Sequence, residues 1–415
     1  MTSSATALRA FSAYGIELEY MIVDSDSLAL LPIADRLLQN ASGHYANEVK
    51  KGRFAWSNEL TLHLVEIKNA PPQARLEGLA EGFQAELRSI AALLAEFGAR
   101  LMPGAMHPWM NPANETRLWP HHGAAIYRSY DRIFDCRSHG WANIQSMHLN
   151  LPFAGDEEFA RLHAAARLVL PILPALAASS PVAEGRAQEA LDFRMQCYRL
   201  HPARVPSLIG RLVPDNASSR NGYEAEVLAP MYRDIASLDP DGVLQHEWLN
   251  TRGAIPRFDR DALEIRVIDL QECPQADLAI AALTSAVARA LYQGRWSPPE
   301  AQRRIATGAL ADILHACIRD ADRALIVDAD YLNLLGFPQD RCEAHELWRH
   351  LFASCAADPL LSQVNLAPLD LILSRGPLAR RIMRALGANF ERHSLHAVYR
   401  ELCDCLADGR LFMDR

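Results

Sequence analysis

The segment Tyr14–Asp24, with the sequence YGIELEYMIVD, constrains the fold more than any other part of the chain. Its β-branched and aromatic residues favour a β-strand. Hydrophobic residues at even positions alternate with Glu17 and Glu19, and side chains two residues apart lie on one face of a strand. Both carboxylates are therefore predicted to point the same way. If this strand stood alone, the two glutamates would most simply be solvated surface residues.

Three later segments repeat this pattern of a hydrophobic strand with polar side chains on one face. They are Asn58–Lys68, Asn143–Asn150 and Leu263–Asp269. In the second, Ser146, His148 and Asn150 share a face. In the third, Glu264 and Arg266 do. The repetition predicts one sheet that gathers these groups on a single concave surface.

Such a gathering predicts a metal site. Glu17, Glu19, Glu66, His148 and Glu264 could not remain unpaired on one surface, because like charges raise one another's pKa or require a cation. Oxygen-rich clusters with at most one imidazole suit Mg²⁺ or Mn²⁺ better than zinc or copper. We therefore predict a site that holds several metal ions and, through them, the phosphates of a nucleotide.

Six short motifs follow one another between residues 11 and 290. They are Gly15–Glu19, Glu59–Glu66, Gly104–Pro108, His148–Asn150, Ala178–Pro181 and Glu264–Asp269. In this order and spacing the chain resembles the glutamate–cysteine ligase type 2 family of carboxylate–amine ligases, which shares the glutamine-synthetase catalytic fold. Beyond about residue 295 the resemblance is looser and rests mainly on Tyr399–Gly409.

The resemblance implies an α+β fold of glutamine-synthetase catalytic type. Its antiparallel sheet would be partly barrel-like, with metal ligands on the concave face and helices on the outer face. The expected organisation is a catalytic domain over residues 1–295 and a helical C-terminal extension over 296–415, packed on the same domain. Helices are predicted at 73–97, 156–180 and 275–293, and throughout the region after Pro298. The stretch 202–240 is predicted to form irregular loops.

The implied activity is ATP-dependent amide formation with Mg²⁺ or Mn²⁺. ATP would convert a carboxylate, which the family suggests is L-glutamate, into an acyl phosphate that an amine attacks. The expected metal ligands are Glu17, Glu19, Glu59, Glu66, His148 and Glu264. Arg266, with Glu264, would be catalytic by stabilising the transferring phosphoryl group, although it could also simply pair with Glu264. Arg194, Asn150 and Arg132 are expected to bind substrate, and His107 to lie at the nucleotide.

Glu59 does not fit a regular strand that also carries Glu66. The two are an odd number of residues apart, which would send them to opposite faces. Either a bulge intervenes or Glu59 precedes the strand. The family keeps the same separation, which favours a functional arrangement.

Two alternative functions share this fold or this ligand set. One is phosphotransfer to a guanidino or carboxylate substrate, as in guanidino kinases, and the other is binding of ATP or a metabolite without turnover. The sequence contains no GxxxxGK[ST], HExxH or GxSxG motif for a different chemistry.

Net charge, hydrophobic runs and cysteine spacing argue against several classes of protein. The net charge of −8 and the lack of a basic run argue against a nucleic-acid partner. No apolar run predicts a membrane span. The eight cysteines form neither zinc pairs nor a disulfide framework, which suggests reduced thiols in the cytoplasm. A homodimer is a reasonable expectation.

Overall fold

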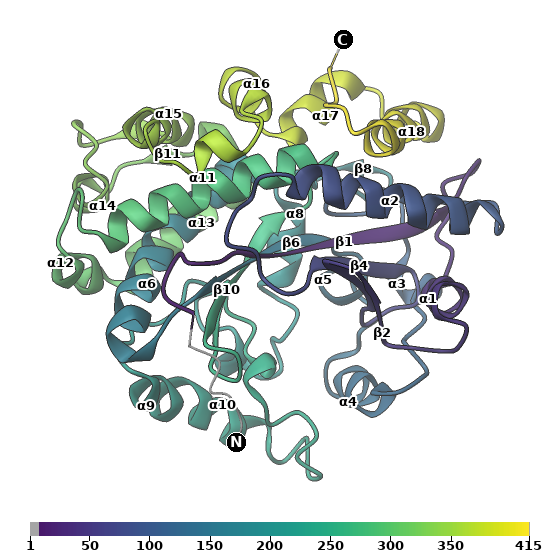
Figure 1. Cartoon of the computed structure of the whole chain (residues 1–415), viewed down its shortest axis with the longest axis horizontal. Helices are drawn as coiled ribbons and strands as arrows, with labels where there is room; N and C mark the ends of the chain where they lie inside the picture. Colours follow the sequence, from purple (N-terminus) through teal and green to yellow (C-terminus); the bar gives the residue numbers. More distant parts are fainter. Residues whose placement is uncertain (1–7, 415) are drawn as a thin grey trace.

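The computed structural model describes residues 8–414, and an eight-stranded antiparallel sheet lies at its centre (Figure 1). The strand order is β2-β3-β4-β1-β6-β10-β9, with β5 also paired to β1. The strands are β1 (Gly15–Asp24), β2 (Glu48–Lys51), β3 (Phe54–Asn58), β4 (Leu64–Asn69), β5 (Ala99–Met102), β6 (Ser146–Pro152), β9 (Ala254–Arg257) and β10 (Ala262–Asp269).

Strand β1 has the alternation that its sequence predicts. Ile16, Leu18 and Tyr20 are fully buried in the hydrophobic core, while Glu17 and Glu19 lie on the other face. One edge of β1 pairs with β4, and the other pairs with β6 over its first half and β5 over its second. The mixed fold and the antiparallel sheet are confirmed. Among the described residues β2 and β9 remain separate edges, so the sheet is open and its partly barrel-like form is not confirmed.

Long apolar helices cover the core face of the sheet. Figure 1 shows α2 (Leu79–Ala95) and α11 (Pro274–Tyr292) running along one side of it. Helix α6 (Gly155–Val169) packs against α11 and β10, and continues through a 3₁₀ turn at Pro171 into α7 (Leu173–Ala177). The segment Gly155–Ala177 is apolar enough to span a membrane, but 94% of its most apolar stretch is buried within the protein. It is therefore a core element here.

The remaining helices fall into two groups, one before α11 in the sequence and one after it. The first group is α1 (Ala34–Ser42), α3 (Pro112–Glu115), α4 (Ala124–Phe134), α5 (His139–Ala142), α8 (Phe193–Tyr198), α9 (Arg220–Tyr223) and α10 (Ala229–Ile235). The second is α12 (Pro299–Arg304), α13 (Thr307–Asp320), α14 (Ala329–Leu334), α15 (Ala344–Cys355), α16 (Ala367–Arg375), α17 (Leu378–Leu386) and α18 (Arg392–Asp408).

Three of the predicted elements are corrected by the structure. The helix predicted from residue 73 begins only at Leu79, because Gly78 adopts a left-handed conformation with φ of 73°. The stretch 202–240 is partly helical, since α9 and α10 are joined by a π-helical turn. The region after Pro298 is not wholly helical, because two short strands, β11 (Leu325–Ile326) and β12 (Cys342–Glu343), pair within it.

Buried polar contacts fasten the C-terminal helices to the rest of the protein. Arg381 on α17 is fully buried and pairs with Glu272 at 2.6 Å, and it also donates a hydrogen bond to the carbonyl of Phe412. The indole of Trp348 on α15 donates to the carbonyl of Ile172 at 2.8 Å. Each contact pairs a buried N–H donor, Nη1 of Arg381 and Nε1 of Trp348, with an acceptor.

Candidate active site

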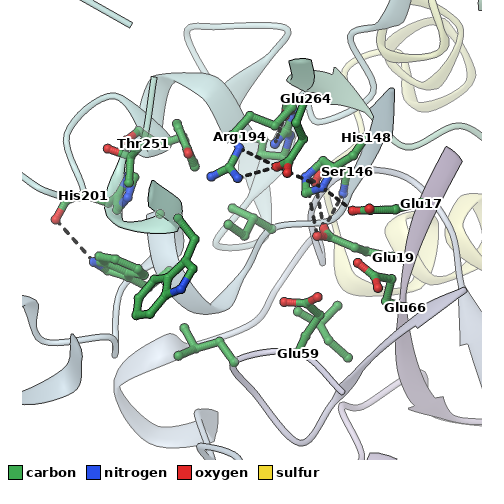
Figure 2. Close-up of a pocket in the computed structure, with 18 of the residues that line it drawn as sticks. Glu17, Glu19, Glu59, Glu66, Ser146, His148, Arg194, His201, Thr251 and Glu264 are labelled. Carbon is green, nitrogen blue, oxygen red and sulfur yellow. Dashed lines mark hydrogen bonds and ion pairs between the residues drawn. The ribbon is translucent and has the colours of Figure 1, made fainter. Parts of the chain in front are cut away.

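A cavity of about 370 Å³ opens on the polar face of the sheet (Figure 2). The carboxylates that line it come from β1, the loop before β4, β4 and β10: Glu17, Glu19, Glu59, Glu66 and Glu264. The cations are Lys68, Arg194, Arg257, Arg260 and Arg266, and two histidines, His148 and His201, also line the cavity. An aromatic wall contains Tyr127, Tyr130, Trp141, Tyr198 and Trp248.

Strand register brings the predicted metal ligands together. Glu19 on β1 lies directly opposite Glu66 on β4, and Glu17 lies opposite His148 on β6. One oxygen or nitrogen from each of Glu17, Glu66 and His148 falls within 4.8 Å of the others. The same holds for Glu19, Glu59 and Glu66. Glu66 therefore belongs to two adjacent clusters.

Glu59 reaches the cavity from a loop. Strand β3 ends at Asn58 and β4 begins at Leu64, so Glu59 precedes the strand and escapes its alternation. Of the two explanations for its odd spacing from Glu66, the structure shows this one. Among the described residues, the Glu59 carboxylate has neither a hydrogen-bond donor nor an ion-pair partner.

The acids of the second cluster favour a bound cation. Burial raises the pKa of Glu59 well above its usual value, and the Glu66 carboxylate raises it further. Burial also raises the pKa of Glu66, and the charge of Glu17 adds to this effect. A divalent ion would relieve this repulsion, and carboxylate oxygens are the ligands that Mg²⁺ and Mn²⁺ prefer. The donor set therefore fits the predicted metal.

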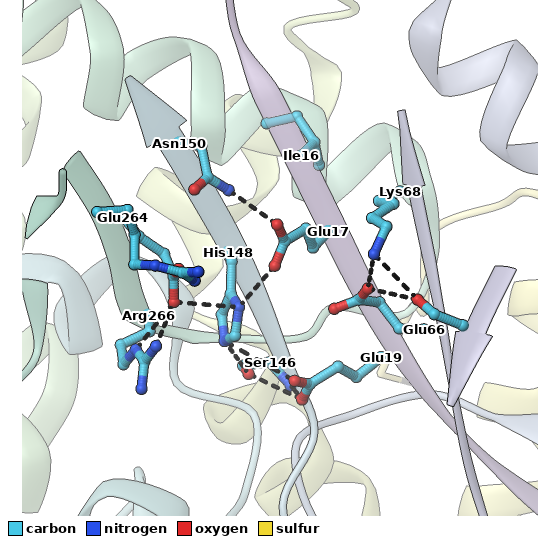
Figure 3. A network of polar contacts seen from close by, with 12 residues as sticks. Ile16, Glu17, Glu19, Glu66, Lys68, Ser146, His148, Asn150, Glu264 and Arg266 are labelled. Atoms are coloured by element: carbon cyan, nitrogen blue, oxygen red, sulfur yellow. Dashed lines mark hydrogen bonds and ion pairs between the residues drawn. The ribbon is translucent and has the colours of Figure 1, made fainter. Parts of the chain in front are cut away.

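His148 lies at the centre of a hydrogen-bond network (Figure 3). Its Nδ1 is 3.0 Å from a Glu17 oxygen, and its Nε2 is 3.0 Å from the Ser146 hydroxyl. Burial lowers its pKa, but the hydrogen bond to Glu17 and the nearby charges of Glu19 and Glu264 outweigh this and raise it to about 9. The imidazole is therefore protonated when these carboxylates are its only partners.

Glu264 joins two arginines. It forms an ion pair with Arg266, and the Arg257 Nη1 lies 3.2 Å from its other oxygen. Burial raises the pKa of Glu264, but the Arg266 charge, with His148 and Arg257, lowers it to about 2. The ion pair between Arg266 and Glu264 does not remove Arg266 from the site, because its side chain also lines the cavity.

A β-bulge in β10 determines which side chains reach the cavity. Ile265 pairs with Leu149, but Ile268 pairs with Met147, so Arg266 and Val267 together oppose one residue of β6. The extra residue shifts the alternation by one. Asp269 consequently lies opposite Ser146, although its spacing from Glu264 would have placed it on the other face.

Asp269 forms an ion pair with Arg194, a residue of α8 that lines the cavity. Arg194 is 1% exposed, and its Nε donates to Asp269. Asp269 also accepts hydrogen bonds from the Ser179 amide and the Ser180 hydroxyl, each at 2.8 Å. These two serines belong to the Ala178–Pro181 motif, so the structure gives that motif a role in orienting Arg194.

Three residues expected at the substrates lie outside the cavity lining. His107 is fully buried, with its Nε2 2.8 Å from the Leu28 carbonyl and its ring against Trp109. Arg132 is exposed and donates to the Leu238 carbonyl. Asn150 lies at the edge of the network, where its amide donates to Glu17 at 3.2 Å. His107 and Arg132 thus make their contacts outside the lining of this cavity.

Several lining residues were not predicted. Lys68 contacts Glu66 at 3.0 Å and Glu48 at 3.2 Å; its spacing of two from Glu66 on a strand could have identified it. Arg257 and Trp248 come from segments with no recognisable pattern. Arg257 lies at the end of the edge strand β9, and Trp248 lies in a 3₁₀ turn before it, so tertiary structure determines both positions.

Comparisons with known proteins identify the family of the chain. The model of glutamate–cysteine ligase family 2 matches residues 13–325. The chain belongs to this family. Membership of glutamate–cysteine ligase family 2 indicates an ATP-dependent ligase, which confirms the resemblance seen in the sequence.

Individual relatives support both family and fold. An uncharacterized protein of Archaeoglobus fulgidus is 36% identical over 276 residues, which are 66% of this chain and 74% of that protein. A putative glutamate–cysteine ligase 2-3 of Rubrobacter xylanophilus is 29% identical over 66% of this chain and 69% of its own length. The crystal structure of glutamate–cysteine ligase from Francisella tularensis in complex with AMP has a TM-score of 0.61 at 12% identity, over 97% of this chain and 90% of that one. This last similarity shows a shared fold.

Proposed function

We propose that this protein joins a carboxylate to an amine by way of an acyl phosphate, using ATP and Mg²⁺ or Mn²⁺. The observation that carries the proposal is the pair of acidic clusters that share Glu66, set beside Arg266, Arg257 and Arg194 in one cavity. Acids on one wall and guanidinium groups beside them suit metal-bound phosphates and a carboxylate substrate.

The cage would consist of Glu17, Glu19, Glu59, Glu66, His148 and Glu264. A divalent ion bound there would neutralise phosphate charge and polarise phosphoryl oxygens. Arg266, fixed by Glu264, would donate hydrogen bonds to the transferring phosphoryl group. Arg194, fixed by Asp269, would bind an anionic oxygen of substrate or phosphate. Both arginines are held before any ligand arrives, so little reorganisation would accompany the reaction.

The reaction consists of two displacements. A carboxylate oxygen of the substrate attacks the γ-phosphorus, and the bond to the β-phosphate oxygen breaks to release ADP. The amine nitrogen then attacks the acyl carbon, the C–O bond to phosphate breaks, and the amine gives up a proton. Glutamate is the proposed acid, because the Rubrobacter relative carries a glutamate–cysteine ligase name. The AMP complex of the Francisella enzyme supports a nucleotide as the other ligand.

ADP release from the purified protein tests the proposal. The assay contains ATP, Mg²⁺, L-glutamate and a panel of amines that includes cysteine, with EDTA as a control. We expect amine-dependent ADP release and a product whose mass is that of the amide. A stable phosphorylated acid or guanidino compound would instead identify a phosphotransferase. ATP binding without turnover across the panel would contradict the proposed activity.

A further inference from the structure

A second basic cavity lies at the junction of α12 and α13, and it shares no lining residue with the active-site cavity. Its lining includes Arg167 from α6, Asn216, Glu300, Arg303 and Arg304 from α12, and Thr307 at the start of α13. The three guanidinium groups face one carboxylate, so the lining carries an excess of positive charge.

Arg167 has an unusual environment. Its side chain is fully buried, and among residues 8–414 it has no carboxylate within ion-pair distance. Its Nε donates to the Pro214 carbonyl at 2.9 Å, and its Nη2 donates to the Ile305 carbonyl and the Thr307 hydroxyl. Its Nη1 has no hydrogen-bond partner within the described part of the chain. A buried cation with an unused donor is costly unless an anion compensates it.

The neighbouring acids do not supply that anion. Asp215 directly follows Pro214, whose carbonyl accepts a hydrogen bond from Arg167. The Asp215 carboxylate is already paired with Arg252 at 2.8 Å. Glu300 pairs with Arg303 at 3.4 Å. Burial lowers the pKa of Arg167 to about 10, although the Asp215 charge opposes this. The Arg304 side chain is exposed and has no ion-pair partner among the described residues. Positive side chains therefore outnumber negative ones in the lining of this cavity.

The start of α13 adds to this charge. The helix has 14 residues, its N-cap residue Ala306 provides no side-chain hydrogen bond, and its first turn contains no acid. The free backbone N–H groups at such an end attract anions, most strongly phosphate. Nη2 of Arg167 contacts the residues on either side of Ala306, which places the buried charge at the same helix end.

We propose that this cavity binds a phosphate group. The geometry supplies what a phosphate dianion requires, namely a helix N-terminus, two guanidinium groups at the rim and a third, uncompensated one behind them. The site is independent of the proposed ligase reaction. The phosphate would be either free or part of a phosphorylated metabolite.

Calorimetric titration of the full-length protein tests this proposal. Inorganic phosphate and ribose 5-phosphate are the probes, at constant ionic strength with NaCl as the control anion. The double variant Arg303→Gln, Arg304→Gln should bind phosphate about tenfold more weakly, because two charge-assisted hydrogen bonds are lost. The matched control is Arg233→Gln, Arg400→Gln, which removes the same charge from two exposed positions and should bind like the wild type.

A third variant separates this cavity from the active site. Arg266→Gln should keep the phosphate affinity if the binding occurs at α12 and α13. Equal binding of both probes would assign free phosphate as the ligand, and tighter binding of ribose 5-phosphate would assign a phosphorylated metabolite. Wild-type affinity in the Arg303, Arg304 double variant would overturn the proposal, as would the absence of binding beyond the NaCl control.

Discussion

The Nε of Arg194 lies 2.5 Å from Oδ1 of Asp269, and both side chains are shielded from solvent, with exposures of 1% and 0%. Asp269 belongs to the bulged strand β10, and Arg194 belongs to α8. The ion pair therefore joins the sheet to the helix that supplies a cavity arginine. Removing one partner of a buried pair leaves the other charge without compensation.

Asp269→Asn should consequently destabilise the protein and reduce its activity. We expect a loss of about 3 kcal/mol in the free energy of unfolding, the size typical of a broken buried pair, measured by urea denaturation. Asp404→Asn is the control, because Asp404 pairs with Arg100 but is 43% exposed, and it should cost less than about 1 kcal/mol. Equal effects of the two substitutions would contradict a special role for Asp269.

Glu264→Gln should abolish turnover while preserving the fold. The amide keeps the size of the side chain but removes the charge that fixes Arg266 and Arg257. Loss of preorganised transition-state contacts lowers turnover by about 100-fold or more, which the ADP-release assay measures. Circular dichroism checks folding, and Glu77→Gln, at an exposed pair with Arg75, is the matched control. Near-normal turnover would rule out the proposed cage.

Glu59→Gln should have opposite effects with and without metal. The pKa of Glu59 is raised by burial and by Glu66, so its charge opposes folding when no cation is bound. In EDTA we expect the Tm of the variant to exceed that of the wild type by about 1–3 °C, because the substitution relieves roughly 1 kcal/mol of charge repulsion. In excess Mg²⁺ the stabilisation by metal should shrink, because one ligand is lost. Thermal scans with a Mg²⁺ titration measure both, and a lower Tm in EDTA would argue against the repulsion.

His163→Phe should make the protein less sensitive to acid. Burial, with Arg167 and Arg252 nearby, lowers the pKa of His163 from 6.5 to about 3. The unfolded chain therefore binds a proton between pH 6.5 and 3 that the folded protein does not, and stability falls as the pH drops through this window. The imidazole packs between Phe159 and Tyr223 and has no hydrogen-bond partner in the described chain, so phenylalanine suits the space.

The expected gain for His163→Phe is up to about 2 kcal/mol at pH 5 relative to pH 8. Urea midpoints of wild type and variant at the two pH values provide the measurement. Parallel losses of stability in both proteins would show that His163 is not the group responsible.

The sequence predicted the parts of the site that follow from local alternation. Glu17 and Glu19 share a face because side chains alternate along a strand, and the same rule put Ser146 and His148 on one face of their strand. It gave no indication that Asp269 would pair with Arg194, because the bulge in β10 depends on pairing with a distant strand. His107 and Arg132 were expected at the substrates through family resemblance alone, and tertiary packing places both outside the cavity lining.

The position of β1 at the centre of the sheet also affects how the protein is made. Glu19 accepts its hydrogen bonds from Ser146, which lies 127 residues further along the chain. A ribosome therefore releases β1 long before β6 exists to cover its second edge. During that interval an apolar strand with free N–H and C=O groups is open to mispairing with other chains. Protection of the growing chain would therefore matter for the segment that also supplies two acids of the proposed metal cage.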